Sequence, residues 1–257
     1  MSHPSNQKHQ VFALLRSIET GDHAPVASIN PTRYIQHNLG VADGLAGFGA
    51  VLAALPPGSG RARPVRVFQD GDFVFAHTEY DFFGPKIGFD VFRFEDGKIV
   101  EHWDNLQPTP AGPSPSGRSM IDGPTEATDL GQTEANKALV RRFLEEVLVA
   151  GKLGALGQYF DGDRYLQHNP GVADGLSGLG AAMAEMQRRG QAMRFSRVHR
   201  VLGEGSFVLA MSEGTIGDRP TAFYDLFRVE QGKIAEHWDT VEAIPPRDQW
   251  KNANGKF

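Results

Sequence analysis

Residues Asp90–Asp104 read DVFRFEDGKIVEHWD, and the stretch recurs at Asp225–Asp239 as DLFRVEQGKIAEHWD. Eleven of the fifteen positions are identical, whereas unrelated segments of ordinary composition share about one. The chain therefore carries the same structural unit twice. Each stretch joins two aromatic and β-branched runs through a Gly-Lys turn, which predicts a β-hairpin. Each hairpin holds an Asp on its first strand and His-Trp-Asp on its second, so the search for a site begins here.

A second repeat lies upstream of each hairpin. Tyr34–Phe48 reads YIQHNLGVADGLAGF and Tyr165–Leu179 reads YLQHNPGVADGLSGL, again with eleven of fifteen positions identical. Apolar residues at helical spacing predict helices before and after this motif, and Pro56-Pro57 is expected to end the later helix of the first copy. Strands are expected at 64–69, 72–80, 87–94 and 98–106, and at 193–202, 206–214, 220–229 and 233–242. Three helices followed by four antiparallel strands predict an α+β fold with the helices on one sheet face.

These patterns divide the chain into four segments. We expect a first domain at 1–107, a Pro/Gly-rich linker at 108–132, a second domain at 133–245 and a polar tail at 246–257. The linker is long enough to reach around one domain, and each antiparallel sheet has a face without helices. We therefore expect the two copies to pair within the chain as a pseudo-dimer, with further oligomerisation left open.

Composition excludes several classes of protein. The net charge is −5, with both signs mixed along the chain, which argues against a nucleic-acid partner. The absence of cysteine excludes disulfides and zinc–thiolate sites. Neither a signal-peptide pattern nor an apolar run of membrane-spanning length is found. We expect a cytoplasmic protein with no membrane partner.

The motifs YIQHN…ADGLAG and GFDVFRFEDGKIVEHWD, with their copies, resemble the SnoaL-like family of the nuclear-transport-factor-2-like superfamily. The most similar branch is the one of polyketide-cyclase type that is labelled as predicted aldol-condensation-catalysing. The resemblance implies two tandem cystatin-cone domains, each with about three helices packed on a curved antiparallel sheet. It covers both copies and excludes the linker and tail. Because the superfamily includes cyclases, isomerases, dehydratases, epoxide hydrolases and non-catalytic binders, it implies a fold more than a reaction.

The resemblance also implies site residues. In the family's polyketide cyclases an Asp inside the cone acts as acid and base, assisted by a His. Asp90 and Asp225 match that Asp, and His77 lies where the assisting His would be. The counterpart of His77 is Met211, so we expect the first copy to hold the more polar site. The second copy would then bind a different ligand or serve mainly as a structural partner.

The residues of the hairpin leave two registers open. A two-residue turn places Asp90 opposite Trp103, and a three-residue turn with a bulge places it opposite His102. In either register Asp90 shares a face with Phe92 and Phe94, where burial would tune it for proton transfer. The alternative is an Asp that hydrogen-bonds locally at a strand edge.

The histidines have two interpretations each. His37 and His168, in the QHN motif, either satisfy loop backbone or face the sheet Asp at the mouth of the cone. His102 and His237 are either half-exposed or paired with the Asp across the strands. Asp43 and Asp174 are expected to cap the following helix. The catalytic candidates are Asp90, His37, His77, His102, Asp225, His168 and His237. The candidates for the pocket wall are Tyr34, Phe73, Phe75, Phe92, Trp103, Tyr165, Phe207, Phe227 and Trp238.

The predicted function follows from these groups. The chain contains no HxH or HExxH spacing, so neither a metal nor another cofactor is expected. We expect a cofactor-independent cyclase, isomerase or lyase that uses Asp/His acid–base chemistry on a small hydrophobic carbonyl compound. The alternative is a non-catalytic protein of the same fold that binds a small hydrophobic ligand.

Overall fold

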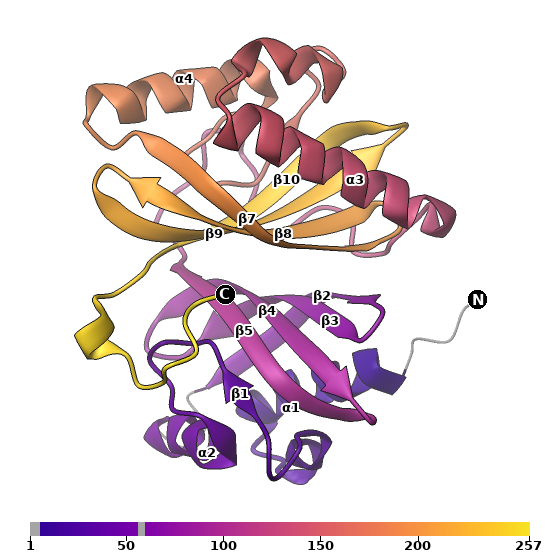
Figure 1. The fold of residues 1–257 in the computed structure, drawn as a ribbon, viewed down its shortest axis with the longest axis vertical. Coiled ribbons are helices and arrows are strands. Elements are labelled where there is room, and N and C mark those ends of the chain that lie inside the picture. The colour runs from indigo at the N-terminus through magenta and orange to yellow at the C-terminus, as the bar shows by residue number, and fades with distance from the viewer. Residues whose placement is uncertain (1–5, 56–59) are drawn as a thin grey trace. The chain divides into compact units, whose positions relative to one another are not determined.

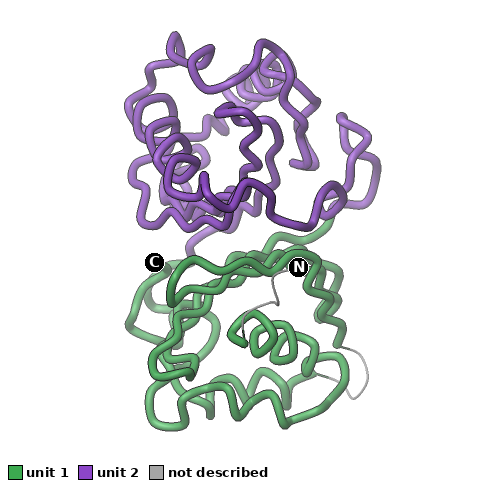
Figure 2. Tube along the Cα trace, turned by 90° about the vertical axis from the view of Figure 1, so that its right-hand side faces the viewer, with its two compact units in different colours: residues 1–109, 245–257 green, residues 110–244 purple. Residues whose placement is uncertain are grey.

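The computed structural model describes residues 6–55 and 60–257. The chain forms two compact units, Met1–Thr109 with Pro245–Phe257, and Pro110–Ile244 (Figure 2). Most of the expected linker thus belongs to the second unit, and the expected tail belongs to the first. The expected helix stop at Pro56-Pro57 lies outside the described residues. In the described part of the chain no helix is long and apolar enough to cross a membrane.

The two units repeat the same α+β order, with helices on one face of each sheet (Figure 1). The first unit contains α1 (Asn6–Thr20), the 3₁₀ helix η1 (Ala24–Ser28), β1 (Ile35–Gln36), α2 (Gly44–Ala54), β2 (Arg61–Asp70), β3 (Phe73–Asp81), β4 (Pro85–Glu95) and β5 (Lys98–Pro108). The second contains η2 (Leu130–Gln132), α3 (Thr133–Phe143), the π-helix η3 (Leu144–Val149), η4 (Leu153–Gln158), β6 (Leu166–Gln167), α4 (Gly175–Arg188), β7 (Met193–Glu204), β8 (Phe207–Ile216), β9 (Arg219–Glu230) and β10 (Lys233–Ala243). A last short helix, η5 (Arg247–Gln249), lies in the tail.

Each sheet is mixed because of one short strand that the sequence did not predict. The orders are β1-β5-β4-β3-β2 and β6-β10-β9-β8-β7. The outer strands β1 and β6 have two residues each and run parallel to β5 and β10, while the other neighbours are antiparallel. Gln36 pairs with His102, and Gln167 pairs with His237. This pairing places the QHN motif beside the second strand of the hairpin.

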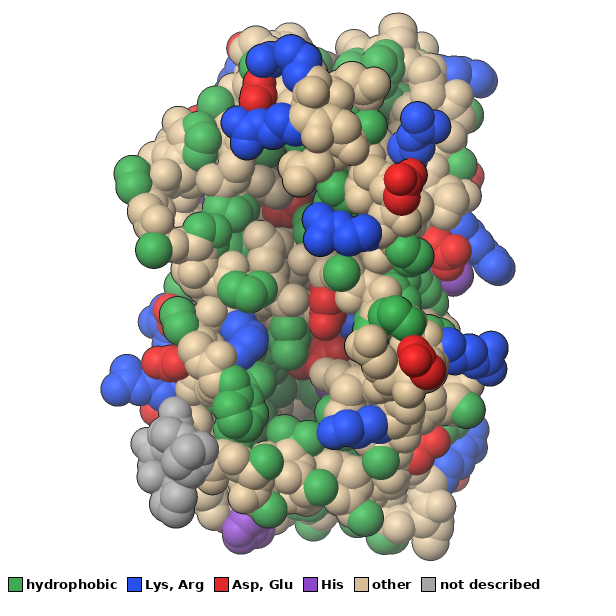
Figure 3. Space-filling model, turned by 90° about the vertical axis from the view of Figure 1, so that its left-hand side faces the viewer, with side chains coloured by type: hydrophobic (Ala, Val, Ile, Leu, Met, Phe, Trp, Pro, Cys, Tyr) green, Lys and Arg blue, Asp and Glu red, His purple; other side chains and the backbone are tan. Residues whose placement is uncertain are grey.

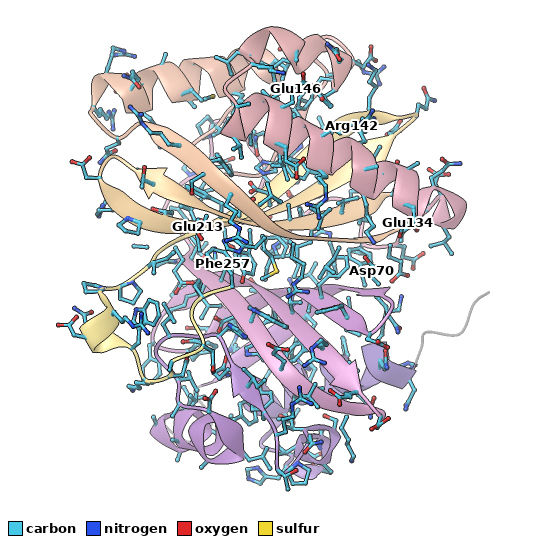
Figure 4. All side chains as sticks on the ribbon, in the orientation of Figure 1. Asp70, Glu134, Arg142, Glu146, Glu213 and Phe257 are labelled. Carbon is cyan, nitrogen blue, oxygen red and sulfur yellow. The ribbon has the colours of Figure 1, made fainter. Side chains whose placement is uncertain are left out.

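The helices cover the sheets with the apolar faces that their spacing predicts. In the second unit Val140 and Phe143 belong to the buried core, together with Phe227 of the sheet. The polar residues Glu134 and Arg142 follow the outer side of the same helix (Figure 4). An equivalent cluster in the first unit joins α1 to its sheet and includes Val11, Leu14, Leu15, Phe92 and Ile99. Burial of such side chains supplies the main driving force for the fold.

The glycines of the repeated ADGLAG motif are explained by the backbone conformation. Gly44 and Gly175 begin their helices at φ of +77° and +86°, values that favour glycine. Three residues later, a Cβ on Gly47 would lie only 1.8 Å from the carbonyl oxygen of Ala42. In the second unit a Cβ on Gly178 would lie 2.3 Å from the carbonyl oxygen of Ala173. Backbone geometry therefore requires these glycines.

The hairpin register differs from both predicted ones. Glu95 pairs with Lys98 across a two-residue turn whose residues, Asp96 and Gly97, have φ of 49° and 74°, as a type I′ turn requires. Further along, Arg93 pairs with Glu101 and Phe94 with Ile99, so Val100 is an extra residue in β5. This β-bulge shifts the register, and Asp90 lies opposite Asp104.

The second hairpin has the same irregularity. Its bulge falls between Ile234 and Glu236, and Asp225 lies opposite Asp239. The expected register with Trp103 is wrong because it lacks the bulge within β5, and the one with His102 is wrong because it places the bulge at the turn. In both copies the aspartate of the first strand shares a face with the His and the Asp of the second.

Segments from outside each repeat bind the back of each QHN motif. In the first unit, Asn254 Nδ2 donates to the carbonyl oxygen of Gln36 (2.9 Å) and to Asp43 Oδ1 (2.7 Å), and Asn252 Nδ2 donates to the carbonyl oxygens of Asn38 and Val41. In the second unit the former linker takes this place. There Trp238 Nε1 donates to the carbonyl oxygen of Asp122 (3.0 Å), and Arg118 pairs with Asp174 (2.7 Å).

These contacts predict that the tail stabilises the first unit. Replacing both asparagines, Asn252→Ala with Asn254→Ala, removes the four hydrogen bonds that their side chains make to residues 36–43. Because each is worth about 0.5–1.5 kcal/mol net, the first unit should lose about 2 kcal/mol or more of stability. Hydrogen exchange at residues 36–43 should accelerate, while the exposed control Gln249→Ala should leave it unchanged. Unchanged exchange in the double variant would contradict a stabilising role for the tail.

Candidate functional site

The first candidate site consists of Asp90 on β4 and His102 and Asp104 on β5. His102 Nε2 lies 3.3 Å from Asp90 Oδ1, and one ligand atom from each of the three side chains lies within 4.8 Å of the others. All three are buried. Buried ionisable groups need partners, and here His102 and Asp90 partner each other.

The QHN motif determines which ring nitrogen of His102 carries a hydrogen toward Gln36 and which faces Asp90. Gln36 Oε1 accepts the backbone N–H of Asn38 (2.9 Å) and lies 3.0 Å from His102 Nδ1. Because an oxygen that accepts is the amide oxygen, Nδ1 of His102 carries a hydrogen and donates it. Nε2 therefore faces Asp90, and a proton between these two atoms satisfies both. Asn38 Nδ2 donates to Asp104 Oδ2 (2.6 Å).

The second unit repeats the arrangement with Asp225, His237 and Asp239. His237 Nε2 lies 2.9 Å from Asp225 Oδ1, and Nδ1 lies 2.8 Å from Gln167 Oε1. That amide oxygen accepts the backbone N–H of Asn169 (3.1 Å). The side chain of Asn169 donates to Asp239 Oδ2 (2.7 Å).

The two copies differ in what satisfies the remaining carboxylate oxygens. In the first copy Asp90 Oδ2 accepts hydrogen bonds from Tyr80 OH (2.7 Å) and Thr78 Oγ1 (3.2 Å). Asp104 Oδ1 has no hydrogen-bond partner among the described residues, but the ammonium of Lys256 lies 3.8 Å away. In the second copy, Asp225 Oδ2 and Asp239 Oδ1 are buried and have no hydrogen-bond partner among the described residues.

Each cluster lies in a cavity on the helix-covered side of its sheet. The cavity of the first unit has a volume of about 100 Å³, and that of the second has about 280 Å³. The second is lined by aromatic, aliphatic and methionine side chains around its polar end, among them Phe143, Met183, Met186, Phe195, Phe223 and Phe227. The space-filling view shows acidic side chains in recesses edged by hydrophobic ones (Figure 3). A cavity with one polar end and apolar walls is the usual form of a small-molecule site.

Burial perturbs the protonation of the second cluster. Burial raises the pKa of Asp239 to about 6, and the charge of Asp225 adds to this, while His237 and Asn169 partly oppose it. Burial acts to lower the pKa of His237, but its hydrogen bond to Asp225 and the charges of both aspartates outweigh it, so that pKa is raised. One imidazolium between two carboxyl groups, one of them titrating near neutral pH, suits acid–base chemistry.

The same three side chains could supply ligand atoms to a metal ion. A carboxylate–imidazole–carboxylate set is an acceptable donor set for several divalent metals. However, His237 Nε2 and Asp225 Oδ1 already bond to each other, so the geometry favours a shared proton.

The comparisons with known proteins agree with the repeats. The family model of the SnoaL-like domain matches residues 11–102 and 140–237, which together make up more than half of the chain. The chain belongs to the SnoaL-like family. No significantly similar sequence was found among curated proteins.

Several solved structures resemble one SnoaL-like domain each. A protein of unknown function with a cystatin-like fold from Xanthomonas campestris is 20% identical, with a TM-score of 0.36, over 44% of this chain and 93% of its own. IdmH of Streptomyces antibioticus, provisionally described as a polyketide cyclase, is 19% identical, with a TM-score of 0.34, over 42% and 91%. An LEH-like epoxide hydrolase of M. tuberculosis is 24% identical, with a TM-score of 0.33, over 43% and 85%.

His37 and His168 do not meet the sheet aspartates of their SnoaL-like domains. His37 stacks on Trp103 (4.6 Å between ring centroids), and its Nε2 lies 3.0 Å from Glu101 Oε1. His168 stacks on Trp238 in the same way and lies 2.8 Å from Glu236. Residues 101 and 103 alternate with His102 and Asp104, so these histidines lie on the sheet face away from the cavity. The expected position at the cone mouth is corrected accordingly.

His77 also lies on the face away from the cavity. It pairs with Phe89 rather than Asp90 in the ladder, stacks on the Phe89 ring at 4.3 Å, and hydrogen-bonds Arg66. The His77/Met211 difference therefore does not set the polarity of the two cavities. The larger cavity is in the second copy. Among the described residues, the second cluster also has two buried carboxylate oxygens without a hydrogen-bond partner and the first has one, contrary to the expected order.

The predicted pocket wall divides by the same alternation. Tyr34, Phe92, Tyr165 and Phe227 line the cavities. The others lie on the opposite face and are absent from both linings, because alternate residues of a strand point to opposite sides; they are Phe73, Phe75, Trp103, Phe207 and Trp238.

Two sets of residues were missed or misassigned. Asp104, Asp239 and the QHN side chains Gln36 and Asn38 were not among the candidates, although the spacing of His-Trp-Asp already places its His and Asp on one face. Asp43 precedes α2 but makes no side-chain cap. It accepts the backbone N–H of Gln36 (2.8 Å) and so braces the residue that orients His102. Asp174 does the same for Gln167 (2.9 Å).

The raised pKa of Asp239 predicts a pH-dependent gain in stability on Asp239→Asn. A native pKa of about 6, against 3.8 in the unfolded chain, means that the native state binds more protons between these values. The native state therefore loses stability as the pH rises through this window. The variant escapes this penalty and should be more stable by about 2–3 kcal/mol at pH ~8.

The same difference should shrink to about 0.5 kcal/mol near pH ~4, where the native carboxyl is neutral and the unfolded one is about half ionised. Urea unfolding followed by hydrogen exchange in β10 measures it. Asp218→Asn, at an exposed position of the same unit, should show no such trend. An Asp239→Asn effect that is equal at both pH values would show that burial does not penalise this carboxylate.

Proposed function

We propose that the second copy is a cofactor-independent acid–base enzyme that moves a proton between the oxygen and the adjacent carbon of a small hydrophobic carbonyl compound. Isomerases, cyclases and aldol-type lyases share this keto–enol step. The observation that carries the proposal is the pair of unpartnered oxygens, Asp225 Oδ2 and Asp239 Oδ1, in the apolar cavity of about 280 Å³. Buried polar atoms without a partner are rare and call for an explanation.

Asp225 is assigned to the substrate oxygen. His237 donates through Nδ1 to Gln167, so its second proton lies toward Asp225 Oδ1. Asp225 Oδ2 is thereby left as an acceptor that can receive the proton of an enol. The imidazolium beside it stabilises the carboxylate before transfer.

Asp239 is assigned to the carbon. Its Oδ2 accepts from Asn169, so a proton on this carboxyl group resides on Oδ1, which has no partner in the described structure. When Asp225 takes the enol proton, Asp239 gives its own to the carbon, and the reverse reaction exchanges the roles. In both states the cluster holds one imidazolium, one carboxylate and one carboxylic acid, which is a neutral set suited to an apolar cavity.

The first copy supports the alternative function, binding or structure without turnover. Tyr80 and Thr78 satisfy Asp90, and Lys256 neutralises Asp104. The cavity of about 100 Å³ is far below the ~300 Å³ at which ligand sites usually begin, whereas the second cavity, at about 280 Å³, nearly reaches that size. We assign catalysis to the second copy alone.

Deuterium incorporation tests the proposal. A panel of small cyclic and aryl ketones in D₂O, followed by proton NMR, reports exchange next to the carbonyl. Asp225→Asn and Asp239→Asn should each lower the exchange rate by about 10²–10⁴-fold, the usual contribution of a general acid or base. Enolisation of a ketone needs the one carboxyl proton of the cluster at the substrate oxygen. Because the free enzyme, which holds this proton on Asp239, loses it as the pH rises through about 6, kcat/KM should fall above that pH.

Matched variants of the first copy, Asp90→Asn and Asp104→Asn, should leave the exchange rate unchanged. If they abolish exchange while the second-copy variants retain it, catalysis has been assigned to the wrong copy. Full activity of the double variant Asp225→Asn with Asp239→Asn would rule out the acid–base proposal.

A further inference from the structure

In the first copy, a side chain of the protein itself occupies the place that a ligand could take in the second copy. Tyr80 on β3 places a phenol against Asp90, with its hydroxyl donating to Oδ2 at 2.7 Å. The ring lies over Gly88, where a Cβ would come within 2.9 Å of Tyr80 Cε2. Burial and the charge of Asp90 raise the pKa of Tyr80 far above its usual value, so the neutral phenol is the bound form.

The equivalent hydroxyl is missing from the second copy. The alignment Phe73 with Phe207 and Glu79 with Glu213 places Gly214 at the position of Tyr80, and the cavity there is nearly three times larger. A side chain cannot be restored at this position, because a Cβ on Gly214 would lie 1.8 Å from the carbonyl oxygen of Arg194. Asp225 Oδ2, the counterpart of the oxygen that Tyr80 serves, has no partner among the described residues.

The walls of the second cavity suit a flat ring. Phe223, which replaces Gly88, stacks on Phe195 at 4.5 Å between centroids, and both line the cavity. Neither ring has a hydroxyl to offer Asp225. Among the described lining residues none is Lys or Arg, so an anionic carboxylate or phosphate would find only His237 to pair with, already held by Asp225.

We infer that the second copy takes a neutral, flat ring that bears an enolic hydroxyl, a phenol or the enol of a cyclic ketone, and that this hydroxyl donates to Asp225 Oδ2 as Tyr80 donates to Asp90. The inference rests on the proposed function, in which Asp225 serves the substrate oxygen, and it names the substrate class. A phenol is a stable compound with the hydroxyl geometry of the enol, so it serves as the binding probe. The hydrogen bond to a carboxylate distinguishes the ligand from a merely apolar one.

Calorimetry on the full chain at neutral pH tests the inference with p-cresol, the ring of a tyrosine side chain. p-Cresol should bind once per chain and at least about tenfold more tightly than toluene or 4-methylanisole, which cannot donate. Asp225→Ala should reduce p-cresol to the affinity of toluene, whereas Asp90→Ala should leave it unchanged. Equal affinities for p-cresol and 4-methylanisole in the wild type would overturn the inference.

Two further arms separate the outcomes. Tyr80→Ala should open the first cavity and raise the p-cresol stoichiometry from one to two, and a stoichiometry that remains at one would contradict the use of Tyr80 as the model. Cyclic ketones should be better substrates for deuterium exchange than open-chain ketones of the same carbon number, and p-cresol should compete with them. Tight p-cresol binding without any exchange activity would overturn the proposed function and leave the ligand class standing.

Discussion

One extra residue in the second strand of each hairpin, Val100 or Ala235, determines which side chains meet in this protein. With the bulge, Asp90 and Asp225 lie opposite a second aspartate and diagonal to a histidine on the same face. Without it, every residue beyond that point would move to the other side of the sheet. The two-residue strands β1 and β6 then hydrogen-bond along the bulged strand and bring the glutamine that orients the histidine. The positions of all the other site residues thus depend on the bulge.

The two copies hold the same polar cluster, but in the first a side chain fills the cavity beside it and in the second the cavity stays open. Both keep the Asp–His–Asp cluster, the glutamine and the asparagine at nearly equal distances. Two rings in the cavity differ: Tyr80 of the first copy is Gly214 in the second, and Gly88 is Phe223. The tyrosine fills space and supplies a hydrogen bond, so the first cluster needs nothing more at that oxygen. In the second copy both the space and the acceptor remain, which is why its chemistry can be directed at a ligand.

Much of the fold could be predicted from the sequence, since the repeats identify two domains and the apolar periodicity identifies the helices and strands. The site was only partly predictable. Val100 and Ala235 both suit a strand, so nothing in the alternation of residues shows that one of them is extra. The strands at Ile35 and Leu166 are too short to have a period. His77 and His37 looked functional by residue type, but the register turns both away from the cavity, and burial against Phe89 and Trp103 accounts for them.

The two segments that bind the QHN motifs, residues 110–132 and 245–257, are synthesised at different times relative to the domains that they complete. The second unit is completed by residues 110–132, which leave the ribosome before the strands that they cover. The first unit is completed by residues 245–257, which are synthesised after the whole second unit. A nascent first domain therefore presents its QHN loop without Asn252 and Asn254 while the whole second domain is translated. Its final hydrogen bonds form only after residues 245–257 have been made, so the first domain can reach its native state only after the second has been synthesised.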